Sequence, residues 1–371
     1  MFLCSIGNRF GGDTDPPRLI VGLLEVDCWF ANYLSTHPII RPEYVSIVAP
    51  CEDGLFQAKS PIKWMQQPAY EARLYMSFVT FRTMHDSHMC WDYPALQSIL
   101  YLTQLRLQDA NHRMNTLETQ EQQDNRLEPW RVWVGEARSV NLVHLTVNLF
   151  STSSNVMRNS SINCVVLWHS NCLSLTANSH LFEVALGRQS ASSIFPAMEE
   201  IAAWTRLPAA RRACLHAGEL YHLLMHRRVS DTVNLHTALT LFKAAVTLGM
   251  YVLTQSQLHP MSTGQPLELL GHFDWAAIGD AGLGGESNPE RNALQFNHGG
   301  SREAVNFIQN GGDFSINGDV FSAGYASARR GLLHFADLME GTGKWKSQKF
   351  CHILHIISED LMEVEATDEE D

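Results

Sequence analysis

Residues 230–254 read SDTVNLHTALTLFKAAVTLGMYVLT, and no other part of the chain shows so regular an amphipathic pattern. The apolar residues recur every three or four positions, the period at which side chains of an α-helix return to one face. Ser230 or Asp231 precedes the first of them, where a capping side chain is expected. The predicted apolar stripe is formed by Leu235, Leu239, Phe242, Val246, Gly249 and Leu253.

Helical patterns also occupy most of the remaining chain. They occur in residues 65–114, 129–150, 196–208, 209–226, 302–308, 329–339 and 346–361. Strand signals are sparse, and the chain has no internal repeat. The sequence therefore predicts an all-α protein with an irregular multi-helix architecture.

The distribution of polar residues suggests where the helical parts begin and end. Residues 115–128 are polar and rich in Gln and Glu, so we expect an N-terminal helical part over residues 1–127 and a second over 128–358. Residues 256–300 are rich in Gly, Pro, Ser and Asn, which favours a long irregular loop with at most one short helix. The acidic residues 359–371 are expected to be a disordered tail.

Bulk composition limits the kinds of partner. The chain has 371 residues, of which 45% are hydrophobic and 18% charged, as in globular proteins. Its formal net charge of −12 repels phosphate, so the chain as a whole is a poor candidate for binding nucleic acid.

Cysteine usage and hydropathy favour an intracellular protein. The 8 cysteines are scattered without a C-x-x-C pair, as expected for buried reduced thiols and not for a disulfide framework or a zinc knuckle. The N-terminus lacks the order of a signal peptide. The most apolar candidate for a membrane span, residues 140–150, is interrupted by polar side chains, so no membrane association is expected.

The 17 histidines raise the question of a metal site. His222 and His226 are four residues apart, but Leu223 stands where a zinc protease of the H-E-x-x-H type needs glutamate. His216, Glu219 and His222 could serve a metal-dependent helical enzyme, which is the least favoured alternative. Ordinary helix histidines explain the pattern better, because isolated matches of this length are common by chance.

Other reaction centres are equally incomplete. Ser322-Ala323-Gly324 supplies half of a nucleophile elbow and follows no predicted strand. The glycines of residues 279–285 have neither the lysine nor the preceding strand of a phosphate-binding loop. We therefore expect no enzyme, no catalytic residues and no cofactor in this chain.

Basic pairs are the remaining candidates for a functional surface. Arg211-Arg212, with His216 and Glu219 one and two turns later, and Arg329-Arg330 could meet an acidic partner. Such pairs more often lie on a solvated face or bind the carbonyl groups at helix ends. We predict a regulatory or partner surface here and keep these alternatives open.

Several blocks, in their order and spacing, resemble the fungal-specific transcription factor domain (the middle homology region) of proteins that also carry Cys2His2 zinc fingers. The resemblance covers residues 128–358. The blocks are Glu128-Pro129-Trp130-Arg131-Val132-Trp133, Leu167-Trp168-His169, Cys172-Leu173-Ser174-Leu175, residues 181–188, residues 208–220, Leu248-Gly249-Met250-Tyr251, Ala328-Arg329-Arg330-Gly331, Lys344-Trp345-Lys346 and Ile353-Leu354-His355-Ile356.

The resemblance implies a nuclear regulator of transcription by RNA polymerase II, with secondary metabolism as one expected target. The helical domain of this family is thought to mediate regulation, dimerisation or response to an effector. The family's fingers have no counterpart here, so zinc and DNA contact are expected only through a missing module or a partner. Expected partners are other transcription regulators or a second copy of the chain.

Two readings of the helical domain remain open beside this one. One is a co-regulator that acts through protein–protein contacts. The other is a sensor whose small-molecule effector occupies an apolar pocket among Trp130, Trp133, Trp168 and Trp204. An ordinary aromatic core explains the same tryptophans more simply.

Overall fold

The computed structural model describes residues 16–41, 45–48, 75–77, 93–121, 162–188, 190–228, 231, 233–255, 265–283, 299–341 and 347–368. Helices account for 74% of the residues described, which confirms the predicted all-α class. The helices are α1 (Pro16–Leu34), α5 (Tyr93–Glu121), α8 (Ile162–Thr176), α9 (Ser179–Ala185), α10 (Ile194–Thr205), α11 (Pro208–Met225), α12 (Leu235–Thr254), α13 (Trp275–Ile278), α15 (Gly299–Asn310), α16 (Tyr325–Glu340) and α17 (Gln348–Asp368), with a 3-10 turn at Ala191–Ser193.

Two small sheets accompany the helices. The strands β1 (Ser46–Val48) and β2 (Tyr75–Ser77) form an antiparallel pair. In the second sheet, β3 (Leu267–Glu268) runs parallel to β4 (Phe314–Ile316), which pairs antiparallel with β5 (Asp319–Phe321). The Glu268 carboxylate accepts hydrogen bonds from the backbone N–H groups of Asn317 and Gly318, so it fixes the turn between β4 and β5.

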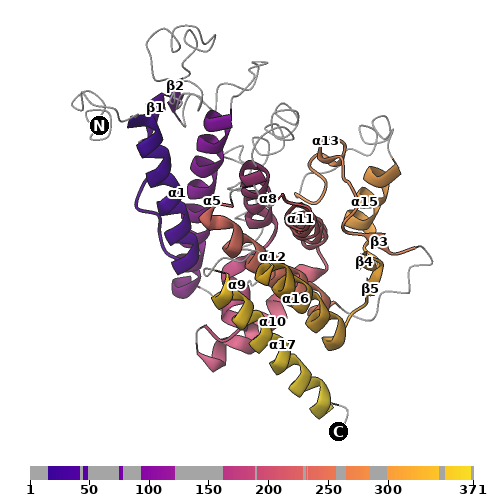
Figure 1. The fold of residues 1–371 in the computed structure, drawn as a ribbon. Coiled ribbons are helices and arrows are strands. Elements are labelled where there is room, and N and C mark those ends of the chain that lie inside the picture. The colour runs from indigo at the N-terminus through magenta and orange to yellow at the C-terminus, as the bar shows by residue number, and fades with distance from the viewer. Residues whose placement is uncertain are drawn as a thin grey trace.

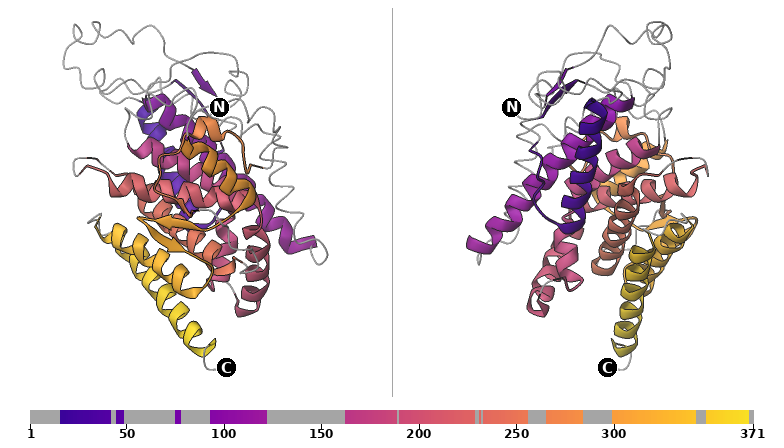
Figure 2. Two further views of the ribbon diagram at one scale, coloured as in Figure 1. Left: turned by 90° about the vertical axis from the view of Figure 1, so that its right-hand side faces the viewer. Right: turned by 60° about the vertical axis from the view of Figure 1, so that its left-hand side comes forward.

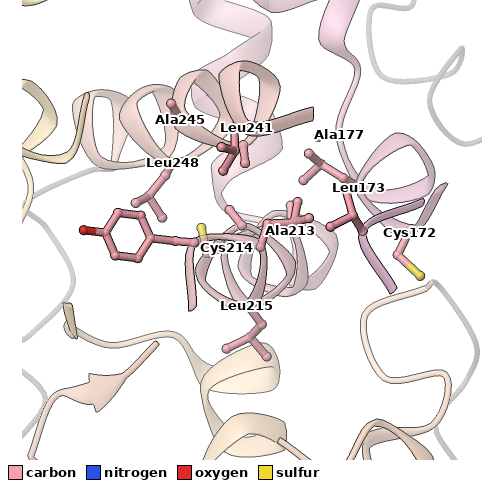
Figure 3. Packing of buried hydrophobic residues seen from close by; sticks show 14 of the residues in the cluster. Cys172, Leu173, Ala177, Ala213, Cys214, Leu215, Leu241, Ala245 and Leu248 are labelled. Carbon is pink, nitrogen blue, oxygen red and sulfur yellow. The ribbon is translucent and has the colours of Figure 1, made fainter. Parts of the chain in front are cut away.

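Helix α12 lies in the interior, against α8, α10, α11, α16 and α17 (Figure 1). Leu241 and Ala245 are fully buried and Leu248 almost so, and Leu241 and Leu248 extend toward α11, which carries Ala213 and Cys214 (Figure 3). The small side chains allow the two helices to approach closely, and their interdigitation gives the interior its density.

The predicted stripe of α12 is thus not its most buried face. Phe242 and Leu253 are only partly buried, because helices contact α12 on several sides and its other face lies deeper. The predicted cap is also wrong: α12 begins at Leu235 after Asn234, and the Asp231 carboxylate accepts the Arg228 N–H instead.

Length and composition alone would allow residues 236–254 to cross a membrane, but 72% of this window is buried inside the protein. That burial is typical of the core helix of a globular domain. Residues 140–150, which seemed more apolar in the sequence, lie outside the described residues.

One hydrophobic cluster extends from the N-terminal helices to the C-terminal ones. It joins Leu24 of α1 and Leu100 of α5 to Trp168 of α8, Leu220 of α11 and Leu354 of α17. The predicted boundary between residues 127 and 128 lies outside the described residues, but the helices on both of its sides share this cluster. Cys28, Cys164, Cys172, Cys214 and Cys351 are free and buried, as expected of reduced thiols.

Residues 265–283 contain the one short helix that the prediction allowed in the loop over 256–300, namely α13, but the segment is more ordered than an irregular loop. This segment contains β3 and α13 and lies against α11, where a Cβ added to Gly218 would come within 2.8 Å of both Cβ and O of Leu269. Its Gly282 has φ +80°, and a Cβ there would lie 2.9 Å from the Pro208 carbonyl. Glycine therefore marks close backbone approach here. Residues 256–264 and 284–298 lie outside the described residues.

The acidic tail needs the same kind of correction. Helix α17 continues to Asp368, so residues 359–368 are helical and the prediction of disorder is wrong for them. The helix is anchored on α16 through Leu354, Ile357 and Leu361, and its last turns extend away from the molecule (Figure 2). The turns that pack on α16 nucleate the helix. The Glu, Leu, Met and Ala residues that follow have a high helix propensity and extend it.

Gly218→Ala should destabilise the protein by roughly 1–3 kcal/mol, the usual cost of overpacking, because backbone at Leu269 must move. Gly22→Ala is the matched control: its Cβ would meet nothing within 4 Å, so alanine's higher helix propensity should make it neutral or stabilising by up to about 1 kcal/mol. Urea unfolding followed by circular dichroism compares the two, and equal effects would contradict the close approach.

Candidate functional site

The predicted surface on α11 lies inside the protein. The exposed fractions are 5% for Arg211, 1% for Arg212, 0% for His216 and 6% for Glu219. Helix α11 contacts α8, α10, α12, α15 and α16, and residues 265–283 also lie against it, with Leu269 at Gly218. The expectation that these side chains form a partner surface is therefore corrected: in this fold they are interior groups.

Arg212 is held by backbone carbonyls and not by a carboxylate. Its Nη1 donates to the carbonyls of Gly279 at 2.8 Å and Ala281 at 2.6 Å, and its Nε donates to Nε2 of His216 at 3.3 Å. The guanidinium carbon lies 5.5 Å from the ring centroid of Trp275, within range of a cation–π contact. Burial lowers the pKa of Arg212 to about 10, so the group remains charged at neutral pH.

Arg211 binds the end of another helix. Its Nε donates to the Ile308 carbonyl at 2.7 Å and its Nη2 to the Gln309 carbonyl at 3.0 Å, both in the last turn of α15. These carbonyls lack partners within their own helix and carry the negative end of its dipole. Helix-end binding, the alternative that the sequence left open, is what Arg211 does.

The hydrogen bonds around His216 determine its tautomer. Because arginine Nε can only donate, Nε2 of His216 must accept and its proton must sit on Nδ1. Nδ1 of His216 lies 3.0 Å from Nδ1 of His169, so His216 donates and His169 accepts. The result is a directed chain from Arg212 through His216 to His169.

Aromatic rings enclose this chain and keep both imidazoles neutral. His216 stacks on Trp275 with ring centroids 4.0 Å apart, and Trp168 meets His169 edge-on at 4.7 Å. Burial, and next the charge of Arg212, lowers the pKa of His169 to about 3 and that of His216 well below its ordinary value. Neutral imidazoles match the donor and acceptor roles that the geometry assigns.

Glu219 lies one turn further along α11, where its Oε1 accepts the backbone N–H of Phe273 at 3.4 Å. Burial raises the pKa of Glu219 to about 7, and the Phe273 N–H and the Trp275 indole partly offset this shift. The carboxyl group therefore ties residues 265–283 to α11, as Arg212 does from the other end of the segment.

The three residues of the metal hypothesis are engaged separately. His216 contacts Trp275, Glu219 binds the Phe273 backbone, and His222 lies edge-on to His226 with centroids 4.5 Å apart. Within the part of the chain that the structure describes, no group of three or more His, Cys, Asp or Glu side chains could hold a metal ion.

The second predicted arginine pair lies on α16. Arg330 is exposed, with its guanidinium 4.7 Å from the ring centroid of Phe321 and a hydrogen bond to the Val320 carbonyl. Arg329 is half-buried. Of the six residues predicted for a partner surface, Arg330 alone is classed as exposed.

The tryptophans of the sensor hypothesis fill the core where the structure describes them. Trp168 packs against Trp275, while Trp204 packs against Phe182 and donates its indole N–H to the Thr176 carbonyl at 2.8 Å. Trp130 and Trp133 lie outside the described residues.

A groove that the sequence analysis missed lies elsewhere, between α9, α12, α17 and the end of α1. Its volume is about 490 Å³, and its walls include Phe182, Leu239, Phe242, Val246 and Phe350. Leu239, Phe242 and Val246 belong to the stripe of α12 that the sequence assigned to the core. They are exposed to a cavity because no helix covers that side of α12 completely.

Lys243 gives this groove a charged group. Its Nζ donates to Oδ1 of Asn32 and, at 3.1 Å, to Oγ of Ser179. Burial lowers the pKa of Lys243. One sequence signal was available: Lys243 is the only charged residue of α12, and a lone lysine in an apolar helix often faces a cavity or an edge.

Comparison with family models, with curated proteins and with solved structures found no match to this chain.

Arg212→Ala should destabilise the protein by roughly 3 kcal/mol or more, because the buried carbonyls of Gly279 and Ala281 lose their donor. Arg330→Ala, which removes the same group from an exposed position, should cost less than about 1 kcal/mol. Urea unfolding measures both values. A loss for Arg212→Ala no larger than that for Arg330→Ala would contradict an interior structural role.

Glu219→Gln tests the buried carboxyl group. Its pKa is raised from 4.5 to about 7 on folding, so its contribution to stability is fully present below about pH 4.5 and is lost as the pH rises through 7. Relative to wild type, Glu219→Gln should therefore gain roughly 2–3 kcal/mol between pH 5 and pH 9. Comparing both proteins at each pH cancels the histidine contributions. Glu303→Gln, exposed on α15, is the control and should differ from wild type by the same amount at both pH values.

Proposed function

We propose that this chain is the regulatory domain of a fungal transcription factor and acts in the nucleus on transcription by RNA polymerase II. The supporting observation is that family-like blocks far apart in the sequence meet in one place. His169 from residues 167–169 contacts His216 from residues 208–220, and a Cβ at Gly249 would lie 3.0 Å from Leu332, next to the block that ends at Gly331. The first contact joins α8 to α11 and the second joins α12 to α16, and α11 packs directly on α12, so these blocks lie in neighbouring helices.

The interior of the domain supports a function that depends on contacts at the protein surface. The polar groups of α11 are enclosed and occupied with backbone carbonyls, imidazoles and a peptide N–H. DNA contact would come from a separate module or from a partner, because the family's zinc ligands have no counterpart in this sequence.

The strongest candidate for a partner surface is one face of α1. Four apolar side chains along it are exposed, with fractions of 59% for Leu19, 46% for Leu23, 45% for Val26 and 49% for Phe30. Their spacing of four, three and four residues is that of a coiled-coil seam. Helix α1 lies at the edge of the molecule beside α5 (Figure 1), where the helix of a second copy or of another regulator could pair with it.

A tethering experiment tests the proposed function. Fused to a heterologous DNA-binding domain, residues 1–371 should change expression of a reporter gene severalfold relative to that DNA-binding domain alone. Leu23→Glu with Phe30→Glu should reduce the effect, because two carboxylates interrupt the apolar face of α1. An absence of any change, at equal expression and nuclear location, would overturn the proposal.

The matched control changes two exposed apolar residues on another helix. Ile356→Glu with Met362→Glu adds the same charge on α17, where the exposed fractions are 41% and 45%. It should leave the reporter response intact. If both double variants reduce the response equally, the face of α1 is not the partner surface, whereas the regulatory function itself would stand.

A further inference from the structure

The groove beside α12 combines apolar walls with the charged side chains of Lys243, Arg188 and Glu183. Leu239, Phe242 and Val246 project into it from α12, and Phe350 and Ile353 close it from α17. Its volume of about 490 Å³ lies in the range of small-molecule sites. Lys243 lies on the same helix, between Phe242 and Val246, and lines the groove together with Ser179 and Glu183 of α9.

The charged groups that line the groove are not all paired with one another. Arg188 is paired with Glu183 and also donates to the Leu34 carbonyl. Lys243 has only neutral partners at hydrogen-bonding distance among the described residues, Asn32 and Ser179, and Glu183 acts on it at longer range. An ammonium group has three donors, so one remains for an incoming acceptor.

We propose that this groove binds a small amphipathic carboxylic acid, with the carboxylate on Lys243 and the apolar part along Phe242, Val246 and Phe350. A carboxylate is the complement of a partly buried cation whose described hydrogen-bond partners are all neutral, since a charge-assisted hydrogen bond in a partly dry site is strong. The apolar walls have no comparable polar group, so they suit a hydrocarbon chain or ring. The role of this acid as an effector rests on the proposed function, whereas its binding does not.

The physical state of Lys243 agrees with this arrangement. Burial is the largest cause of the lowered pKa of Lys243; the negative charge of Glu183 partly offsets it, and the positive charge of Arg188 lowers the pKa further. A bound carboxylate would offset both effects and raise the pKa again. The favourable interaction would be lost with an alcohol of the same length, which presents no negative charge.

The test uses the full chain and a series of simple acids. Isothermal titration at pH 7 with hexanoate, octanoate and decanoate, below their micelle concentrations, should show one site per chain. Each added methylene should tighten the dissociation constant about fourfold, the value of one buried CH2 group. Decanol should bind more weakly than decanoate.

Two matched pairs of variants locate the site. Lys243→Met should weaken decanoate roughly tenfold to a hundredfold, the range of a hydrogen bond to a charged group, and leave decanol unchanged. Lys349→Met, an exposed lysine of α17, should change neither. Ile353→Glu, at the groove, should weaken decanoate, and Ile356→Glu, which lies outside the lining at a similar exposure of 41% against 40%, should not.

The second pair keeps the test valid if Lys243→Met fails to fold, because Ile353 is an exposed position. Absence of decanoate binding, or equal effects of the groove variants and their controls, would overturn the proposal. So would binding only to phosphatidylserine vesicles, or dimerisation of the chain that Ile353→Glu abolishes in gel filtration. Each of these results is independent of the reporter assay, so a missing ligand and a missing regulatory function are told apart.

Discussion

The guanidinium group of Arg212 is almost fully enclosed, and a charge in that position needs several acceptors around it. The carbonyls of Gly279 and Ala281 and the imidazole of His216 provide them. Those carbonyls reach α11 only because residues 265–283 lie directly against it, at the glycines 218 and 282. The covering segment, the histidine tautomers and the stacking of Trp275 all follow from satisfying one buried cation.

The other buried polar groups of α11 are satisfied in the same way. Arg211 takes the end of α15, Glu219 takes the backbone at Phe273, and each link fastens a different element to α11. Such links are directional, so they select one arrangement among the many that apolar packing would allow. The neighbouring helix α12 contributes apolar packing, which is not directional. Its buried Ala244, Ala245 and Leu248 fill space without requiring a particular partner.

With its central polar groups occupied, the domain presents its unmatched features at its edges. The apolar face of α1 and the groove with Lys243 are two places where the described structure leaves apolar or charged side chains without a partner that fully covers them. A regulatory domain works by changing what it contacts, and a surface is suited to that role when its partner is not part of the same fold. Tyr33 contacts Phe350 at the rim of the groove, so α1 and the groove are physically continuous.

Local regularities in the sequence determined the helical class, the position of α11 and α12 to within a few residues, and the burial of the cysteines that the structure describes. Helical periodicity depends only on residues that are close in the sequence, so it can be recognised without knowing the fold. Tertiary structure decided that Arg211, Arg212, His216 and Glu219 face inward, that residues 265–283 are ordered, and that a groove follows the flank of α12. The reason is that a charged side chain can be buried only where hydrogen-bond acceptors surround it. The acceptors of Arg212 are the carbonyls of Gly279 and Ala281, which are separated from it in the sequence by two further helices, so only the tertiary structure brings them together.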